Sequence, residues 1–334
     1  MRLRFYDPSF ASVEREVERV IDVAWDNYEA SRKSPRTRRA GPEFSDPNAE
    51  LAVEWLDAHD AIADARRRFE DPRSKPRVLL VSASPRSEHT CPSEMSKTFR
   101  LALIGKEAIE SEGFEVDHLE LSRLTSEYGR VIYPCKACVS TAMPLCHWPC
   151  SCYPNNSLGQ VNDWMNEIYP RWVAAHGVLI VTPVHWYQVP STLKSMMDRL
   201  VCADGGNPDP TTTGGKDGAR AKALELEGWH YPRHLAGRAF SVVVHGDTDG
   251  VDPVRRALTD WLTDMHLIPA DPSGGIGRYV GYYAPYATSH LALDADEGLQ
   301  GEMRNAACSL VRRICMLRDG IGRSDEQLSD PRPK

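Results

Sequence analysis

Short apolar runs alternate with helical patterns from residue 76 onward, and this alternation restricts the possible folds more than any other feature. The clearest runs are 77–82 (RVLLVS), 177–182 (GVLIVT) and 238–245 (RAFSVVVH). Runs that are apolar on both faces are typical of parallel strands covered by helices on both sides. A further strand is expected at 114–121 and an edge strand near 279–283. The pattern therefore predicts an α/β protein built around a parallel sheet.

Helical periodicity fills the segments between these strands. The first predicted helix ends near residue 112, and three more span 161–172, 190–200 and 254–266. The apolar residues of a last helix are Leu299, Met303, Ala306, Leu310 and Leu317. The polar residues 319–334 are expected to form a loose tail. Because ligands of such sheets bind at the carboxyl ends of the strands, the loops that follow the strands are the first place to look for a site.

Residues 1–75 have a different pattern and predict an N-terminal helical extension. Two amphipathic stripes span Val13–Trp25 and Leu51–Phe69, and a basic, proline-rich stretch without apolar period (31–48) separates them. This stretch is interpreted as a solvated linker, with an anion-binding patch as the alternative. Two such helices cannot bury their apolar faces alone, so we expect them to pack on the main domain or on a partner subunit.

Composition narrows the functional classes. The formal net charge is −7, which disfavours non-specific binding to nucleic acid. No apolar run approaches the ~18 residues that a membrane span needs, and the first residues lack the apolar stretch of a secretory signal. We therefore expect a cytoplasmic protein that has neither nucleic acid nor a membrane as its partner.

Five of the nine cysteines lie within one short segment, PCKACVSTAMPLCHWPCSC, with the spacing C-x2-C-x7-C-x3-C-x-C. They are Cys135, Cys138, Cys146, Cys150 and Cys152. Because disulfides are rare in a reducing cytosol, clustered cysteines favour metal or redox chemistry there. Thiolates at such spacing can bind an iron–sulfur cluster or tetrahedral zinc, and a segment without metal is the alternative.

The loop after the first strand is rich in groups that bind anions. It contains Ser84 and Arg86, and it reaches Ser96, Lys97 and Thr98 just before a helix. Hydroxyls, an arginine and the amides of a helix N-terminus together suit a phosphate monoester. Ser96 acting only as a helix cap is the alternative. The loop has neither a G-x-G-x-x-G fingerprint nor a Walker lysine motif, which disfavours dinucleotide binding and P-loop chemistry.

Two further loops follow strands at the same expected edge. The loop after 177–182 consists of Pro183, Val184, His185, Trp186 and Tyr187. Its aromatic rings could stack on a flat heterocycle, or they could pack the loop against the core. Gly246 and Asp247 follow the strand at 238–245, in a turn that permits close backbone approach. Three loops that meet at one edge are more specific than any one of them.

The strings ASPR, SKTFRLA and TPVHWYQVPSTLKSMMDRL resemble the NAD(P)H-dependent flavin mononucleotide (FMN) reductases of the flavodoxin-like fold. The resemblance follows the order of elements over residues 76–318. It implies a doubly wound five-stranded parallel sheet of order 2-1-3-4-5. Two departures from the family pattern are Ala83, which replaces a glycine, and the inserted residues 87–95.

Carried over residue by residue, the resemblance assigns parts of an FMN site. Ser84, Arg86, Ser96 and Thr98 would hold the ribityl phosphate, with Lys97 or Thr90 able to take part. The residues from Pro183 to Tyr187 would flank the isoalloxazine ring, and Gly246 and Asp247 would touch its far edge. The flavin carries the chemistry in this family, so no side chain is assigned as catalytic, and His185 is the only candidate worth naming.

The resemblance also implies cofactors and partners. FMN would accept hydride from NAD(P)H as co-substrate and reduce a small-molecule acceptor, such as a quinone, a free flavin, a nitro or azo compound or a metal oxyanion. A homodimer or homotetramer is implied as well. The segment 204–234 is interpreted as a lid or dimer arm over the flavin, with a surface excursion as the alternative.

The cysteine segment is similar, with looser spacing, to the motif of the iron–sulfur flavoproteins, which binds a four-iron cluster. This similarity implies the alternative function, an electron-transfer protein that passes electrons to a protein partner. A third hypothesis is a zinc-ordered interaction module without enzymatic activity.

Overall fold

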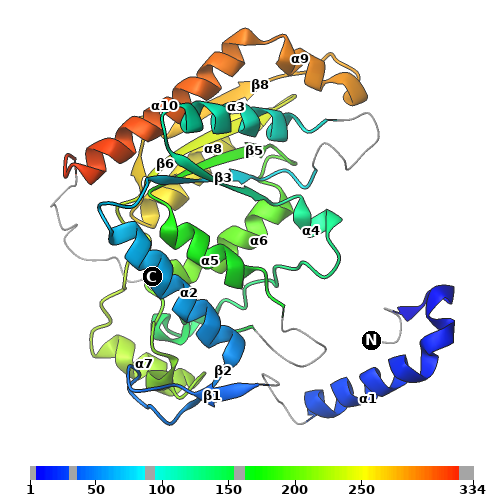
Figure 1. The fold of residues 1–334 in the computed structure, drawn as a ribbon, viewed down its shortest axis with the longest axis vertical. Coiled ribbons are helices and arrows are strands. Elements are labelled where there is room, and N and C mark those ends of the chain that lie inside the picture. The colour runs from blue at the N-terminus through cyan, green and yellow to red at the C-terminus, as the bar shows by residue number, and fades with distance from the viewer. Residues whose placement is uncertain (1–4, 30–35, 87–94, 154–161, 323–334) are drawn as a thin grey trace.

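A parallel sheet with helices on both faces forms the centre of the computed structural model (Figure 1). The structure describes residues 5–29, 36–86, 95–153 and 162–322. The strands of the sheet are β3 (Arg77–Ser82), β4 (Glu115–Glu120), β5 (Gly177–Pro183), β6 (Ala239–Gly246), β7 (Ile268–Pro269) and β8 (Gly275–Tyr279). Their spatial order is β4-β3-β5-β6-β7, and β8 also pairs with β6. The described strands of this central sheet all pair in parallel, so the flavodoxin-like order 2-1-3-4-5 is confirmed.

The fifth position of the sheet is divided between two short strands. β7 pairs with the start of β6 and β8 pairs with its end. The prediction of an edge strand near 279–283 is therefore wrong, because β8 ends at Tyr279. Gly275 explains the difference: a Cβ there would lie 2.0 Å from the carbonyl oxygen of Val242. Close backbone approach requires glycine at this point, and a glycine-rich strand has no apolar pattern that a sequence reader could detect.

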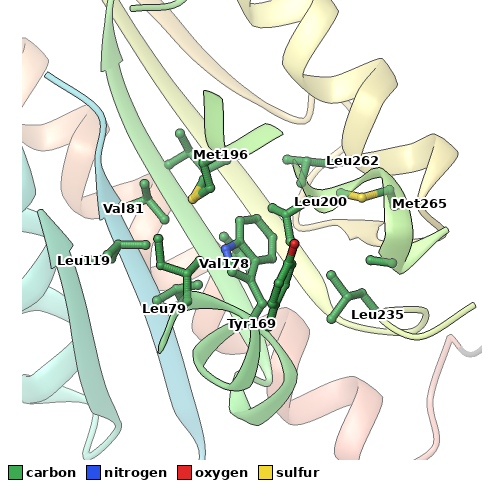
Figure 2. Close-up of a cluster of buried hydrophobic side chains, with 14 of the residues drawn as sticks. Leu79, Val81, Leu119, Tyr169, Val178, Met196, Leu200, Leu235, Leu262 and Met265 are labelled. Carbon is green, nitrogen blue, oxygen red and sulfur yellow. The ribbon is translucent and has the colours of Figure 1, made fainter. Parts of the chain in front are cut away.

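Two hydrophobic cores lie on opposite faces of the sheet. Leu79 and Val81 of β3 belong to one core, whereas Val78 and Leu80 belong to the other. The first core is covered by α2 (Val53–Glu70), α5 (Met165–Ala174), α6 (Ser191–Arg199) and α8 (Val251–Asp264), and the second by α3 (Lys97–Ser111), α9 (His290–Asp294) and α10 (Glu297–Arg318). Figure 2 shows Tyr169 of α5 deep in the first core.

The basic stretch between the two N-terminal stripes contains regular structure. β1 (Thr37–Arg39) pairs antiparallel with β2 (Glu50–Ala52), and Phe44 between them is buried. The Ser45 amide donates to Asp209 Oδ2 at 2.8 Å, which ties the loop to a distant segment. This stretch is therefore more structured than the predicted linker, although its described arginines, Arg36, Arg38 and Arg39, are exposed to solvent. The pairing of two separated strands and one buried aromatic residue give this stretch its structure. Neither feature produces a periodic pattern in the local sequence.

The two N-terminal helices differ in packing. α2 packs against α5, and its Ile62 and Ala65 enter the first core. α1 (Glu14–Glu29) stands apart from the sheet in Figure 1, and none of its described side chains is buried. Among the described residues, no helix has both the length and the apolar character that a membrane crossing needs.

A buried ion pair joins α6 to the chain that precedes α5. Arg199 Nη2 lies 2.5 Å from Asp163 Oδ2, and neither side chain is exposed to solvent. Arg199 Nη1 also donates to the carbonyl oxygen of Tyr133 at 2.9 Å. Because a buried charge without its partner is costly, this pair holds three separate segments in one arrangement.

We expect Asp163→Ala to lower the free energy of unfolding by about 3–5 kcal/mol, because it leaves the Arg199 charge buried and unpaired. Urea denaturation measures the change. The control is Asp64→Ala, which removes the exposed ion pair between Arg67 and Asp64 and should cost less than about 1 kcal/mol. Equal effects of the two substitutions would contradict the importance of the buried pair.

Candidate functional site

The three predicted loops meet at the carboxyl edge of the sheet. The Val184 amide donates to the His245 carbonyl oxygen at 2.9 Å, which joins the loops after β5 and β6. Thr98 Oγ1 and His245 Nε2 lie 2.8 Å apart, which joins the start of α3 to the end of β6. The contacts confirm that distant loops share one edge. Binding of FMN by their residues stays a prediction at this point.

The start of α3 has the features of an anion site. Ser96 caps the helix, and its Oγ accepts a hydrogen bond from the Phe99 amide at 3.3 Å. The first turn, 97–99, carries a lysine and no acidic residue. Lys97 Nζ donates to the Val280 carbonyl oxygen at 3.1 Å, which places its positive charge beside the end of β8. Helix N-terminal amides and a nearby cation together favour a phosphate.

Ser84 and Arg86 lie on the other side of the same loop. Ser84 is buried, and its Oγ accepts a hydrogen bond from the Arg86 amide at 3.1 Å. Burial lowers the pKa of His185, and the nearby positive charge of Arg86 lowers it further. Arg86 is therefore close to the aromatic loop. Thr90 and most of the insertion 87–95 lie outside the described residues.

The aromatic loop presents its rings to solvent. Trp186 is 94% exposed and Tyr187 is 59% exposed. Both residues have left-handed backbone conformations, with φ of 50° and 63°. The alternative that these rings pack the loop against the core is therefore wrong. Strained backbone that displays apolar rings to water is a common mark of a ligand site.

Neighbouring residues hold this loop in place. Val184 is partly buried and packs against the first core, and Pro183 ends β5. A Cβ at Gly250 would lie 3.1 Å from the Cα of Tyr187, so the turn after β6 touches the aromatic loop directly. Gly246 is buried at the end of β6, whereas Asp247 is exposed. The arrangement leaves the two aromatic rings and Asp247 accessible at one edge.

His245 is a site residue that sequence reasoning missed. It is buried, and burial lowers its pKa to about 3, helped by the positive charge of Lys97. The imidazole is therefore neutral at physiological pH, and it pairs with the Thr98 hydroxyl beneath the predicted phosphate site. The sequence offered one signal for this role: His245 directly precedes Gly246, which was already assigned to the FMN site. A histidine at a strand end, however, is usually interpreted as a packing residue.

The described residues fit FMN by their chemistry. Arg86, Lys97 and the start of α3 match the charge of a phosphate, and Trp186 and Tyr187 offer apolar rings to a flat heterocycle.

The cysteine segment forms a second cluster of reactive groups. Cys138 Sγ and Cys152 Sγ lie 3.1 Å apart. Lys216 Nζ lies 3.9 Å from Cys138 Sγ and donates to the Leu145 carbonyl oxygen at 3.1 Å. A hydrogen bond from Cys152 lowers the pKa of Cys138 to about 6, and the Lys216 charge adds to this effect against the opposing influence of burial.

The remaining cysteines of the segment have different surroundings. Cys146 and Cys150 are buried in the first core together with Cys202, which follows α6. A hydrogen bond to Cys152 and burial raise the pKa of Cys150, and burial raises that of Cys146. Cys135 is half-buried, and its sulfur accepts a hydrogen bond from the Ala137 amide at 3.3 Å.

The described residues contain no group of three or more Cys, His, Asp or Glu side chains that could hold a metal ion. A four-iron cluster and a tetrahedral zinc ion both need at least three such ligands around one centre. The predicted iron–sulfur or zinc site therefore has no support from the described residues and stays a prediction.

The segment 204–234 packs on the cysteine segment. The Asn207 amide donates to the Cys146 carbonyl oxygen at 2.7 Å, and the Trp148 amide donates to the Asn207 carbonyl oxygen at 2.8 Å. The helix α7 (Gly218–Leu226) brings Glu225 Oε1 to 2.9 Å from the Met143 amide. A lid or dimer arm over the flavin stays a prediction for this segment.

Comparison with known proteins places the chain in a family. The model of the NADPH-dependent FMN reductases matches residues 76–274. The chain belongs to this family. The match covers β3 to the turn before β8, so it includes the three loops at the carboxyl edge and the cysteine segment.

The individual proteins that match this chain have low sequence identity to it. The iron–sulfur flavoprotein of Methanosarcina thermophila is 31% identical over 125 residues, which are 37% of this chain and 52% of that protein. The chain thus spans about half the length of this curated relative. The structure of RosB with a bound intermediate, 8-demethyl-8-formylriboflavin-5'-phosphate, has a TM-score of 0.48 at 14% identity, covering 73% of this chain and 81% of RosB. The apo form of NADH:FMN oxidoreductase EmoB has a TM-score of 0.39 at 13% identity, covering 75% and 92%.

The neutral state of His245 predicts a pH dependence of stability. Its folded-state pKa of about 3 lies below the ordinary value of 6.5. Between these values the unfolded chain binds a proton that the folded chain does not bind, so the free energy of unfolding decreases as pH falls. Between about pH 6 and about pH 5, the free energy of unfolding should decrease by about 1 kcal/mol more in the wild type than in His245→Gln. Parallel pH profiles from denaturant titration would contradict this assignment.

Proposed function

We propose that this protein is an FMN-dependent oxidoreductase that uses NAD(P)H to reduce a small acceptor. The observation that carries the proposal is the meeting of two complementary surfaces at one sheet edge. The start of α3 with Arg86 and Lys97 suits a phosphate, and the exposed rings of Trp186 and Tyr187 suit a flat heterocycle. Membership in the NADPH-dependent FMN reductase family supports the same cofactor and the same reductant.

Each part of the chain has a role in this proposal. FMN, when bound, supplies the hydride and electron chemistry that no side chain can supply. Arg86 and the amides at the start of α3 bind its phosphate. Trp186 and Tyr187 contact the ring and exclude water from one side. Neutral His245 holds Thr98 beneath the phosphate without adding a charge.

The acceptor is proposed to be a small molecule, such as a quinone, a flavin, a nitro or azo compound or a metal oxyanion. The exposed, apolar ring surface at the sheet edge supports a planar acceptor in particular. The second candidate, electron transfer to a protein partner, would need an iron–sulfur cluster as relay. The Methanosarcina relative is named an iron–sulfur flavoprotein, but the described residues of this chain contain no group of three or more metal-binding side chains.

Anaerobic stopped-flow spectroscopy tests the function. The full chain, reconstituted with FMN, should show a flavin absorption that NADH or NADPH bleaches rapidly and that a small quinone restores. Failure to retain FMN would overturn the proposal. Retained FMN that is reduced by reduced ferredoxin, and not by either nicotinamide, would also overturn it in favour of electron transfer.

Arg86→Gln should weaken FMN binding by roughly ten- to hundredfold, the size expected for a lost charge-assisted hydrogen bond. Quenching of flavin fluorescence on titration with FMN measures the dissociation constant. The control is Arg73→Gln, since Arg73 is 90% exposed and precedes β3 at the other end of that strand. An unchanged dissociation constant in Arg86→Gln would mean that the phosphate binds elsewhere.

A further inference from the structure

The sulfur atoms of the cysteine segment differ in accessibility. Cys146, Cys150 and Cys202 are buried, whereas Cys138 and Cys152 are half-buried. Only the half-buried pair combines close contact with access from solvent among the described cysteines, because the Cys138 and Cys152 sulfurs lie 3.1 Å apart.

This spacing disagrees with shared coordination of one zinc ion. Two thiolates bound tetrahedrally at about 2.3 Å from zinc would lie roughly 3.8 Å apart. A disulfide, in contrast, requires the two sulfurs to approach by only about 1 Å from their present contact, to a bond of about 2.05 Å. The two thiols are therefore in closer contact than two ligands of one zinc ion would be, and the disulfide bond needs only a short further approach.

The surroundings of Cys138 suit an attacking thiolate. Lys216 Nζ lies 3.9 Å from its sulfur, and a hydrogen bond to the Leu145 carbonyl oxygen holds the ammonium group in place. Residues next to Cys138 also line a cavity of about 330 Å³, whose walls include Val139, Ser140 and Tyr231. The cation beside the Cys138 sulfur favours its thiolate form. The cavity lies beside the short helical turn Cys138–Ser140 that carries this cysteine.

We propose that Cys138 and Cys152 form a dithiol that is reversibly oxidised by exchange with a low-molecular-weight disulfide. The Cys138 thiolate attacks one sulfur of the reactant, a mixed disulfide forms, and one thiolate leaves. The Cys152 thiolate then attacks the Cys138 sulfur, an intramolecular disulfide forms, and the second thiolate leaves. Two protein thiols are oxidised, one external disulfide is reduced to two thiols, and the two protons released by the protein reside on the products.

This dithiol does not require bound FMN, so its chemistry can fail or succeed separately from the proposed oxidoreductase function. Lys216 belongs to the segment 204–234, for which a lid or dimer arm over the flavin stays a prediction. The segment would then serve the cysteine site by supplying the cation and one wall of the cavity.

The test uses the full chain, reduced, desalted without oxygen and incubated with glutathione disulfide. Remaining thiols are alkylated, and chymotrypsin, which can cleave after Leu145, separates Cys138 from Cys152 for mass spectrometry. We expect a Cys138–Cys152 linkage that a reductant reverses. Cys152→Ser should accumulate glutathione on Cys138, whereas Cys138→Ser should form neither product. Cys315→Ser is the control, because Cys315 is exposed and distant in sequence, and it should form the linkage at the wild-type rate.

Lys216→Met keeps an unbranched side chain but removes the charge, and it should slow the first exchange step by roughly tenfold. Circular dichroism confirms that each variant is folded. The proposal is overturned if folded wild-type protein forms no Cys138–Cys152 linkage or links other cysteines instead. It is also overturned if the anaerobically purified protein holds stoichiometric iron or zinc that protects both thiols from alkylation.

Discussion

A parallel sheet that is buried on both faces is the constraint on which the rest of this structure depends. The side chains of alternate residues in β3 and β5 belong to two separate cores, and helices cover both cores. Only the ends of the strands remain open, and parallel strands direct all outgoing loops to the carboxyl edge. Anion-binding groups at the start of α3 and the rings of Trp186 and Tyr187 therefore meet without any sequence proximity.

Arg199 connects this edge to the cysteine segment. It ends α6, the helix that follows the aromatic loop, and it pairs with Asp163 in the core. Its guanidinium also lies 5.0 Å from the ring centre of Tyr153, directly after the last cysteine of the segment. A buried arginine that satisfies several segments at once fixes their relative position more strictly than apolar packing does. The candidate FMN site and the cysteine segment are therefore both anchored to Arg199.

Features that depend on local sequence patterns were predicted correctly, whereas features that depend on contacts between distant residues were not. The strands 77–82 and 177–182 were predictable because a buried strand needs a continuous apolar run. β8 was misplaced, since Gly275 is required by a close approach to Val242 that no local pattern announces. The β1–β2 pair was missed for a similar reason: its short strands gain their stability from each other and from the buried Phe44.

The sequence by itself determined the parallel sheet and the loops that carry polar and aromatic groups, because these follow from periodicity and from residue type. The order of the strands was implied by the resemblance to a known family. Only the tertiary structure decided that His245 is neutral beneath Thr98 and that Trp186 faces solvent. It also decided that Cys138 lies between Cys152 and Lys216. These properties depend on burial and on charges from distant segments. Five clustered cysteines are compatible with several chemistries until the distances between their sulfur atoms are known.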